Sequence, residues 1–167
     1  PFPFTKVLLN YFFKYVDAYI VQSGKVEKEL ATIVPNPIYD KVFHPIYDNY
    51  PDIIDKRDAK LKLKIQDSDI VLFFGLIRKY KGLDKLILSM EKVFEEKSNI
   101  KLLIVGECYG EKKKYLSLIE KSNYSDRILW VEEYVKESEV NLYFSASDVV
   151  VLPYLSASQS GIIPLAY

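Results

Sequence analysis

The chain has 167 residues, a size that fits one domain or one domain with a piece of another. Its 23 basic and 23 acidic residues cancel, so no overall positive charge draws it to nucleic acid. One cysteine and one histidine exclude a disulfide framework and leave almost no material for a Cys/His metal site, which favours a reducing, cytoplasmic setting.

The first part of the chain predicts few regular elements. DAYIVQS (residues 17–23) predicts a strand, and KVEKEL (residues 25–30) predicts a short helix. Residues 34–52 hold four of the eight prolines and predict an extended connector. We therefore assign residues 1–33 to the end of an upstream domain and residues 34–58 to a linker.

Four short apolar runs, apolar on both faces, then predict buried parallel strands at residues 70–74, 101–105, 128–131 and 149–152. Helical patterns separate them, for example the apolar stripe from Leu83 to Phe94. This alternation predicts an α/β fold, a Rossmann-like parallel sheet with helices on both faces, over residues 59–167. Because the chain starts without methionine and ends where a helix is predicted to begin, we expect a piece of a longer protein, with this domain incomplete at its C-terminus.

Three cations, Arg78, Lys79 and Lys81, follow the first predicted strand and its glycine in FFGLIRKYKGLDKL (residues 73–86). Gly75 permits close approach of a ligand, Arg78 offers a planar fork for phosphate, and Lys81 offers a point charge just before a predicted helix N-terminus. These residues predict a phosphate site. A solvated turn with ordinary surface cations is the alternative, and the residues alone favour neither.

Small hydroxyl residues follow the last predicted strand in PYLSASQSGIIPLAY (residues 153–167). Ser160 is expected to be an N-cap and Gly161 the first helical residue. Because parallel strands end at one edge of a sheet, this loop is expected to join Arg78 and Lys81 around one anion. The alternative is a capped helix without a ligand.

Other candidates are less specific. Glu107, after the second strand, is suited to sugar hydroxyls or a base edge. The sequence Asp67-Ser68-Asp69 looks like a metal motif but precedes its strand, and we interpret it as a turn. The tyrosines expected near the strand ends suit stacking on a base or sugar, although filling of core or surface is favoured for them: Tyr80, Tyr109, Tyr134 and Tyr154.

Several segments in this order resemble family 4 (group 1) glycosyltransferases. FGLIRKYKGLDKLILSM, KLLIVGE and RILWVEEYVKESEVNLYFSASDVVVLPY resemble the C-terminal domain of that family. YVDAYIVQSGKVEKEL and VPNPIYDKVF resemble the end of its N-terminal domain and the linker. The resemblance implies the GT-B architecture, in which two Rossmann-like domains face a cleft and the C-terminal domain holds a nucleotide-sugar donor.

The family also implies a chemistry. It transfers a sugar to an acceptor with retention, without a metal and without a cofactor; the donor is a UDP- or GDP-sugar. A glycan or lipid-linked acceptor would bind through the remaining domain, as in polysaccharide biosynthesis, at the inner membrane face of the cytoplasm. This chain alone is expected to be inactive.

The resemblance also assigns residues. Lys81 matches the family's diphosphate-binding lysine, whereas Leu76 stands where the family has arginine, so Arg78 is expected to supply the guanidinium. The two glutamates of the family's E-x7-E motif fall at Ser158 and Ala166 and are absent. The expected diphosphate-binding residues are Gly75, Arg78, Lys81, Ser160, Gly161 and Ile162. The expected sugar- and nucleoside-binding residues are Glu107, Tyr134, Val135, Ser158 and Gln159.

Two other functions stay open. The missing glutamates favour a non-catalytic nucleotide-binding module that kept the crevice and lost the chemistry. A nucleotide-sugar epimerase of the same architecture is the second. No residue is assigned as catalytic and none as a metal ligand.

Overall fold

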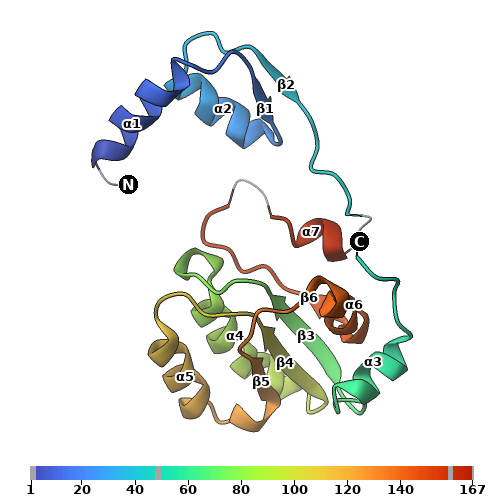
Figure 1. Ribbon diagram of the computed structural model, residues 1–167. Helices are drawn as coiled ribbons and strands as arrows, with labels where there is room; N and C mark the ends of the chain where they lie inside the picture. The colour runs from blue at the N-terminus through green and yellow to red at the C-terminus, as the bar shows by residue number, and fades with distance from the viewer. Residues whose placement is uncertain (1–2, 48–49, 158–159, 167) are drawn as a thin grey trace. The chain divides into compact units, whose positions relative to one another are not determined.

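The computed structural model describes residues 3–47, 50–157 and 160–166. Contacts divide the chain into two units, which are described separately (Figure 1). Unit 1 comprises the described residues of Pro1–Ile46 and Ser158–Pro164, and unit 2 those of Tyr47–Ala157 and Leu165–Tyr167. The domain boundaries expected after residues 33 and 58 stay a prediction.

Unit 1 contains a two-stranded parallel sheet. Its elements are α1 (Pro3–Phe13), β1 (Tyr19–Val21), α2 (Gly24–Ile33) and β2 (Tyr39–Lys41). The strand and the helix predicted within residues 17–30 are confirmed, and β2 lies in the proline-rich connector. Ser23 caps α2, because its hydroxyl accepts a hydrogen bond from the Val26 amide at 3.2 Å.

Unit 2 is built on a four-stranded parallel sheet with the order β5-β4-β3-β6. Its strands are β3 (Asp69–Phe74), β4 (Ile100–Val105), β5 (Ile128–Val131) and β6 (Val149–Val150). The predicted strands are confirmed, although β6 is two residues long and was expected to reach Leu152. The α/β fold with a parallel sheet is therefore confirmed.

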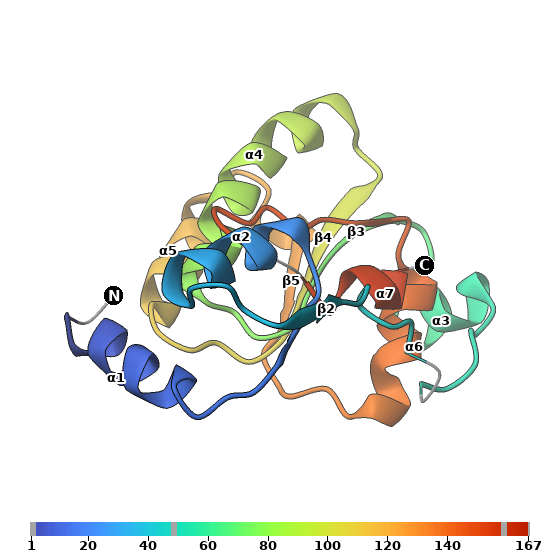
Figure 2. The same cartoon turned by 90° about the horizontal axis from the view of Figure 1, so that it is seen from above.

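Helices cover both faces of this sheet. They are α3 (Lys56–Lys62), α4 (Leu83–Glu96), α5 (Lys112–Lys121) and α6 (Glu137–Ala146), with short 3-10 turns at Lys79–Lys81 and Ser125–Arg127. Figure 2 shows α4 and α5 on one side of the strands and α3 and α6 on the other. None of the helices in the described ranges is both long and apolar enough to span a bilayer.

Alternating residues of the strands supply the two halves of the core. Phe73 of β3 and Ile104 of β4 are buried in one cluster with Leu83 and Met90 of α4. The next residue, Phe74, faces the other way, and its ring centroid lies 4.9 Å from that of Phe144 in α6. Because each strand is apolar on both faces, the sheet can be covered on both sides.

The last helix of the described chain, α7 (Ile163–Ala166), begins later than expected. Ser160 and Gly161 were predicted as its N-cap and first residue, and this prediction is wrong by two residues. The Ser160 hydroxyl accepts a hydrogen bond from the Ile162 amide at 3.2 Å, so Ser160 closes a turn ahead of the helix.

One carboxylate joins three elements at the edge of the sheet where the strands begin. Asp148, just before β6, accepts hydrogen bonds from Lys60 of α3 at 2.7 Å, from the Ile70 amide of β3 at 2.8 Å and from Lys56 at 3.0 Å. Lys60, 8% exposed, also donates to the Ser68 carbonyl at 2.8 Å. Partial burial raises the pKa of Asp148, but the hydrogen bonds from Lys60, Ile70 and Lys56 outweigh it and lower the pKa from 3.8 to about 2.

We predict that Asp148→Asn lowers the free energy of unfolding by about 1–2 kcal/mol at pH 7, since the pair is partly screened by water. The folded-state pKa lies below the unfolded value, so this stabilisation is complete above pH 3.8 and is lost as the pH falls towards about 2. Urea unfolding of wild type and variant between pH 7 and pH 3 measures the difference. A difference that stays constant over this range would contradict the assignment.

Candidate functional site

The order of the strands places a switch point beside β3. The chain runs from β3 to β4 and β5 on one side and returns to β6 on the other side of β3. In open parallel sheets, ligands bind outside the carboxyl ends of the strands at such a point. The loops after β3 and β6 flank it, and they contain the predicted Gly75–Lys81 segment and Pro153.

Glycines let the loops after β3 and β4 lie in contact. Gly75 and Gly106 have φ angles of +96° and +143°, and a Cβ on Gly106 would lie 2.3 Å from the Gly75 carbonyl oxygen. The parallel pairing then continues past the strands, because the Ile77 amide donates to the Glu107 carbonyl at 2.8 Å and the Tyr109 amide donates to the Ile77 carbonyl at 3.0 Å. The indole N–H of Trp130, in β5, donates to the Gly106 carbonyl at 3.4 Å.

A second glycine joins the loops after β3 and β6. Gly82, the residue before α4, has φ +70°, and a Cβ there would lie 2.1 Å from the Pro153 carbonyl oxygen. The Leu155 amide donates to the Tyr80 carbonyl at 2.8 Å, which extends this contact. Only glycine combines this φ with so close an approach of another backbone.

The contact leaves Lys81 buried at the N-terminus of α4. Its side chain is 8% exposed, and its Nζ lies 5.7 Å from the centroid of the Tyr154 ring. Burial, with a smaller contribution from Arg78, lowers the pKa of Lys81 below its usual value of 10.5. The turn therefore holds two positive charges near each other, one of them largely removed from water.

No carboxylate in the described part of the chain neutralises these two cations. The ion pairs found there include neither Arg78 nor Lys81. The acidic residue in the first turn of α4, Asp84, pairs instead with Lys114 at 2.9 Å. Two adjacent cations without a counter-charge, beside a helix N-terminus, are suited to binding an anion.

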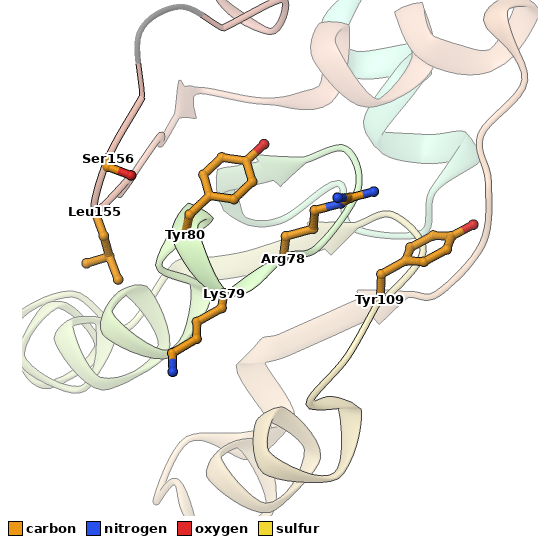
Figure 3. Close-up of a pocket in the computed structure, with 6 residues that line it drawn as sticks. All are labelled: Arg78, Lys79, Tyr80, Tyr109, Leu155 and Ser156. Atoms are coloured by element: carbon orange, nitrogen blue, oxygen red, sulfur yellow. The ribbon is translucent and has the colours of Figure 1, made fainter. Parts of the chain in front are cut away.

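A pocket of about 640 Å³ opens beside Arg78. It is lined by Arg78, Lys79, Tyr80, Tyr109, Leu155 and Ser156 (Figure 3). Its volume lies within the usual range for small-molecule sites, about 300–1,000 Å³. The wall combines Arg78 and Lys79 with two tyrosine rings, which suits a ligand with both an anionic and a planar part.

The structure brings together some of the residues predicted from the sequence. Gly75, Arg78 and Lys81 share one loop at the switch point. Glu107 lies in the loop after β4, where it accepts a hydrogen bond from the Tyr109 hydroxyl at 3.0 Å. Tyr134 and Val135 lie in the loop after β5, before α6. Their roles in ligand binding stay predictions.

The structure does not test the binding roles predicted for the residues of the last loop. Ser158 and Gln159 lie outside the described residues. Ser160, Gly161 and Ile162 group with unit 1, whereas Arg78 and Lys81 belong to unit 2. That these residues meet around one anion stays a prediction.

Sequence reasoning missed part of the pocket wall. Lys79, Leu155 and Ser156 were not predicted, and Tyr80 and Tyr109 were favoured as filling. The tyrosine rings are 44% and 53% exposed and face the pocket. A signal was available for Tyr109, because extending the pairing of β3 and β4 past Gly75 and Gly106 places it next to the cationic loop.

The described residues contain no cluster of three or more His, Cys, Asp or Glu side chains that could hold a metal ion. Asp69 of the Asp67-Ser68-Asp69 sequence begins β3, so this sequence lies at the opposite edge of the sheet from the pocket, as predicted.

Comparison with known proteins decides the family. Residues 55–165 match the family described as glycosyl transferases group 1. The chain belongs to this family. A D-inositol 3-phosphate glycosyltransferase from Segniliparus rotundus is 28% identical over 109 residues, which are 62% of this chain and 24% of that protein.

Solved structures share the fold of this glycosyltransferase chain. Anabaena HepE in complex with UDP and glucose has a TM-score of 0.78 at 14% identity and covers 96% of this chain. Sucrose-phosphate synthase from Thermosynechococcus elongatus has a TM-score of 0.75 at 20% identity and covers 94%. The chain spans 45% and 40% of these two proteins, and about a quarter of the curated relative. The GT-B fold class expected from the sequence is confirmed.

We predict that Gly82→Ala destabilises the glycosyltransferase and abolishes anion binding, because the new Cβ would meet the Pro153 carbonyl at 2.1 Å. Backbone strain at positive φ adds about 1–3 kcal/mol. Gly110→Ala is the matched control, since Gly110 has φ +122° but a Cβ there would meet nothing within 4 Å. Thermal unfolding should therefore show a larger loss for Gly82→Ala than for Gly110→Ala. Equal losses would mean that the contact with Pro153 matters little.

We also predict a pH dependence of anion affinity from Lys81. Its pKa is lowered from 10.5, so its ammonium group loses the proton at a lower pH than an ordinary lysine, and affinity for inorganic pyrophosphate should fall as the pH rises through that pKa. Arginine stays protonated, so Lys81→Arg should not share this fall. The ratio of the two affinities, measured by calorimetry from pH 7 to pH 10, cancels the ionisation of pyrophosphate itself. A constant ratio would show that Lys81 does not hold the anion.

Proposed function

We propose that this chain supplies the nucleotide-sugar donor site of a retaining, metal-independent glycosyltransferase. The enzyme moves a hexose from a UDP- or GDP-sugar to a growing glycan or a lipid-linked sugar. The observation that carries the proposal is the pair Arg78 and Lys81, two neighbouring cations without a carboxylate partner in the described ranges. Structures with the same fold support a nucleotide-sugar, because Anabaena HepE was solved with UDP and with UDP-glucose.

The proposed site acts on the leaving group. In sugar transfer, the bond between the anomeric carbon and the diphosphate oxygen breaks, and a bond from the acceptor oxygen to the same carbon forms. Negative charge grows on the departing nucleoside diphosphate in the transition state. Arg78, Lys81 and the positive end of the α4 dipole stabilise this charge more than they stabilise the bound donor, which lowers the barrier.

Burial of Lys81 makes its charge effective. A fixed charge that is largely removed from water interacts more strongly with the diphosphate than a solvated one, and it needs no reorganisation during the reaction. Because Lys81 is held at 8% exposure by the contact of Gly82 with Pro153, its ammonium group is already in place before the donor binds. In a metal-independent enzyme these cations do the work of a divalent ion.

The remaining parts of the activity lie beyond this chain. The acceptor would bind through the rest of the protein, in the cytoplasm at the inner membrane face. The aromatic wall of the pocket and the loops that contain Glu107 and Tyr134 are proposed to bind the sugar and the nucleoside. No cofactor is needed, since the donor carries the activated bond.

A non-catalytic nucleotide-binding module is the second candidate. The observation that favours it is the presence of Ser158 and Ala166 where the family has glutamates. Such a module would bind nucleoside diphosphates as tightly as an enzyme does and would release no sugar. Turnover of the donor in the presence of acceptor by the full-length protein separates the two functions.

We predict that Lys81→Ala in the full-length protein removes the thermal stabilisation by UDP, GDP or ADP, whichever the wild type binds. A ligand at a hundred times its Kd stabilises by about 2.7 kcal/mol, which a melting experiment resolves. Turnover should fall about 100- to 1,000-fold, the usual cost of removing one group that stabilises transition-state charge.

Lys92→Ala is the matched control, because Lys92 is an exposed lysine in the middle of the same helix. It should keep both the shift and the turnover. Unchanged binding and turnover in Lys81→Ala would refute the donor site at this loop. If Lys81→Ala loses nucleotide binding but the wild type itself shows no turnover, the non-catalytic module is favoured.

A further inference from the structure

We propose that Tyr109 is a positioning residue that holds the Arg78 guanidinium in place for the donor diphosphate, an inference that rests on the proposed function. Tyr109 lies in the loop after β4, and Arg78 lies in the loop after β3. Figure 3 shows the Arg78 side chain between Tyr80 and Tyr109 at the pocket.

The backbone fixes the two residues side by side. Past the glycines, Ile77 and Cys108 form a parallel bridge, and the Tyr109 amide donates to the Ile77 carbonyl at 3.0 Å. Arg78 follows Ile77 directly, and Tyr109 follows Cys108. Their proximity therefore comes from main-chain pairing rather than from chance contact of two flexible side chains.

The side chains meet in a geometry that leaves Arg78 able to bind. Its Cζ lies 5.8 Å from the centroid of the Tyr109 ring, within the range of a cation–π contact. No ion pair occupies Arg78 within the described ranges, so the N–H donors of its guanidinium are available to phosphate oxygens.

The ring itself is anchored. The Tyr109 hydroxyl donates to Glu107 Oε2 at 3.0 Å. This hydrogen bond raises the pKa of Tyr109, so the hydroxyl stays protonated and remains a donor. Glu107 thus orients the ring, and the ring orients Arg78.

Arg78 needs such support because Lys81 repels it. The two cations are close enough for Arg78 to lower the pKa of Lys81, and no carboxylate screens them in the described part of the chain. An unsupported arginine would turn towards bulk water, and ordering it on ligand binding would cost rotamer entropy. The ring of Tyr109 offers an alternative attraction next to the pocket, which reduces this cost.

The competing role for Tyr109 is direct stacking on the nucleobase. A ligand without a base separates the two roles, because it can use Arg78 but cannot stack. Inorganic pyrophosphate is this probe. The measurement is its Kd for the full-length protein by calorimetry, in wild type, Lys81→Ala, Arg78→Ala, Tyr109→Leu, Tyr109→Phe and the double variant Arg78→Ala/Tyr109→Leu.

We predict that Tyr109→Leu weakens pyrophosphate binding about three- to fivefold, the scale of a partly exposed cation–π contact. Arg78→Ala should weaken it at least about tenfold, since a charged hydrogen-bonding group is lost. The double variant should bind no worse than Arg78→Ala alone, because Tyr109 acts only through Arg78. Tyr109→Phe keeps the ring and should lose less than Tyr109→Leu.

Tyr39→Leu is the matched control. Tyr39 is also partly exposed and its hydroxyl also donates to a glutamate, Glu27, at 2.7 Å, but Tyr39 does not line the pocket. It should leave the Kd unchanged. Melting temperatures of all variants check that each one is folded.

The outcomes separate this inference from the proposed function. Unchanged pyrophosphate affinity in Tyr109→Leu, or a loss that adds to that of Arg78→Ala, overturns the positioning role while Lys81→Ala still defines the donor site. Unchanged affinity in both Lys81→Ala and Arg78→Ala overturns the proposed function and this inference with it.

Discussion

The close approach of Gly82 to the Pro153 carbonyl is the contact on which the site depends. It joins the loop after β3 to the loop after β6, and it closes the turn that buries Lys81. A lysine side chain is seldom buried without a partner, because desolvation of its charge is costly. Folding of the sheet and the contact of Gly82 with Pro153 hold Lys81 in place despite that cost. An anion that pairs with the ammonium group would offset part of the desolvation cost, which favours anion binding.

The same pair of strands is held at its other end by Asp148. β6 pairs with β3 over only two residues, Val71 with Val149 and Leu72 with Val150, so the ladder alone is weak. Asp148 binds the Ile70 amide and Lys60 at the start of the strands, and Pro153 and Leu155 contact the turn at their end. A short strand is thus fixed by side-chain and loop contacts at both of its ends.

Much of unit 2 could be predicted from the sequence because its strands are continuous apolar runs. Burial on both faces requires such runs, so β3, β4 and β5 are visible without any long-range information. The candidate anion site could also be proposed from the sequence, because two cations and a glycine follow a strand; its ligand stays a prediction. The end of β6 was not, since Val151 and Leu152 are as apolar as the residues before them and only the tertiary contacts decide where pairing stops.

Features that depend on contacts between two distant segments could not be predicted from the sequence. The turn sets the positive φ of Gly82. Glycine is needed there because the carbonyl of Pro153, 71 residues later, leaves no room for a Cβ. The placement of Tyr109 beside Arg78 depends on pairing that continues past two glycines, where strand signals end. The start of α7 was misjudged because a serine closes a turn as readily as it caps a helix.

Trp130 is the single tryptophan of the chain, and its indole N–H contacts the carbonyl of Gly106, the residue that brings the loops after β3 and β4 together. The indole therefore lies next to the loop that contains Glu107 and Tyr109. Its ring also contacts that of Tyr115 in α5, with the ring centroids 6.4 Å apart. The chain thus contains one intrinsic tryptophan fluorophore beside the loop after β4, which makes local rearrangement there observable without any label.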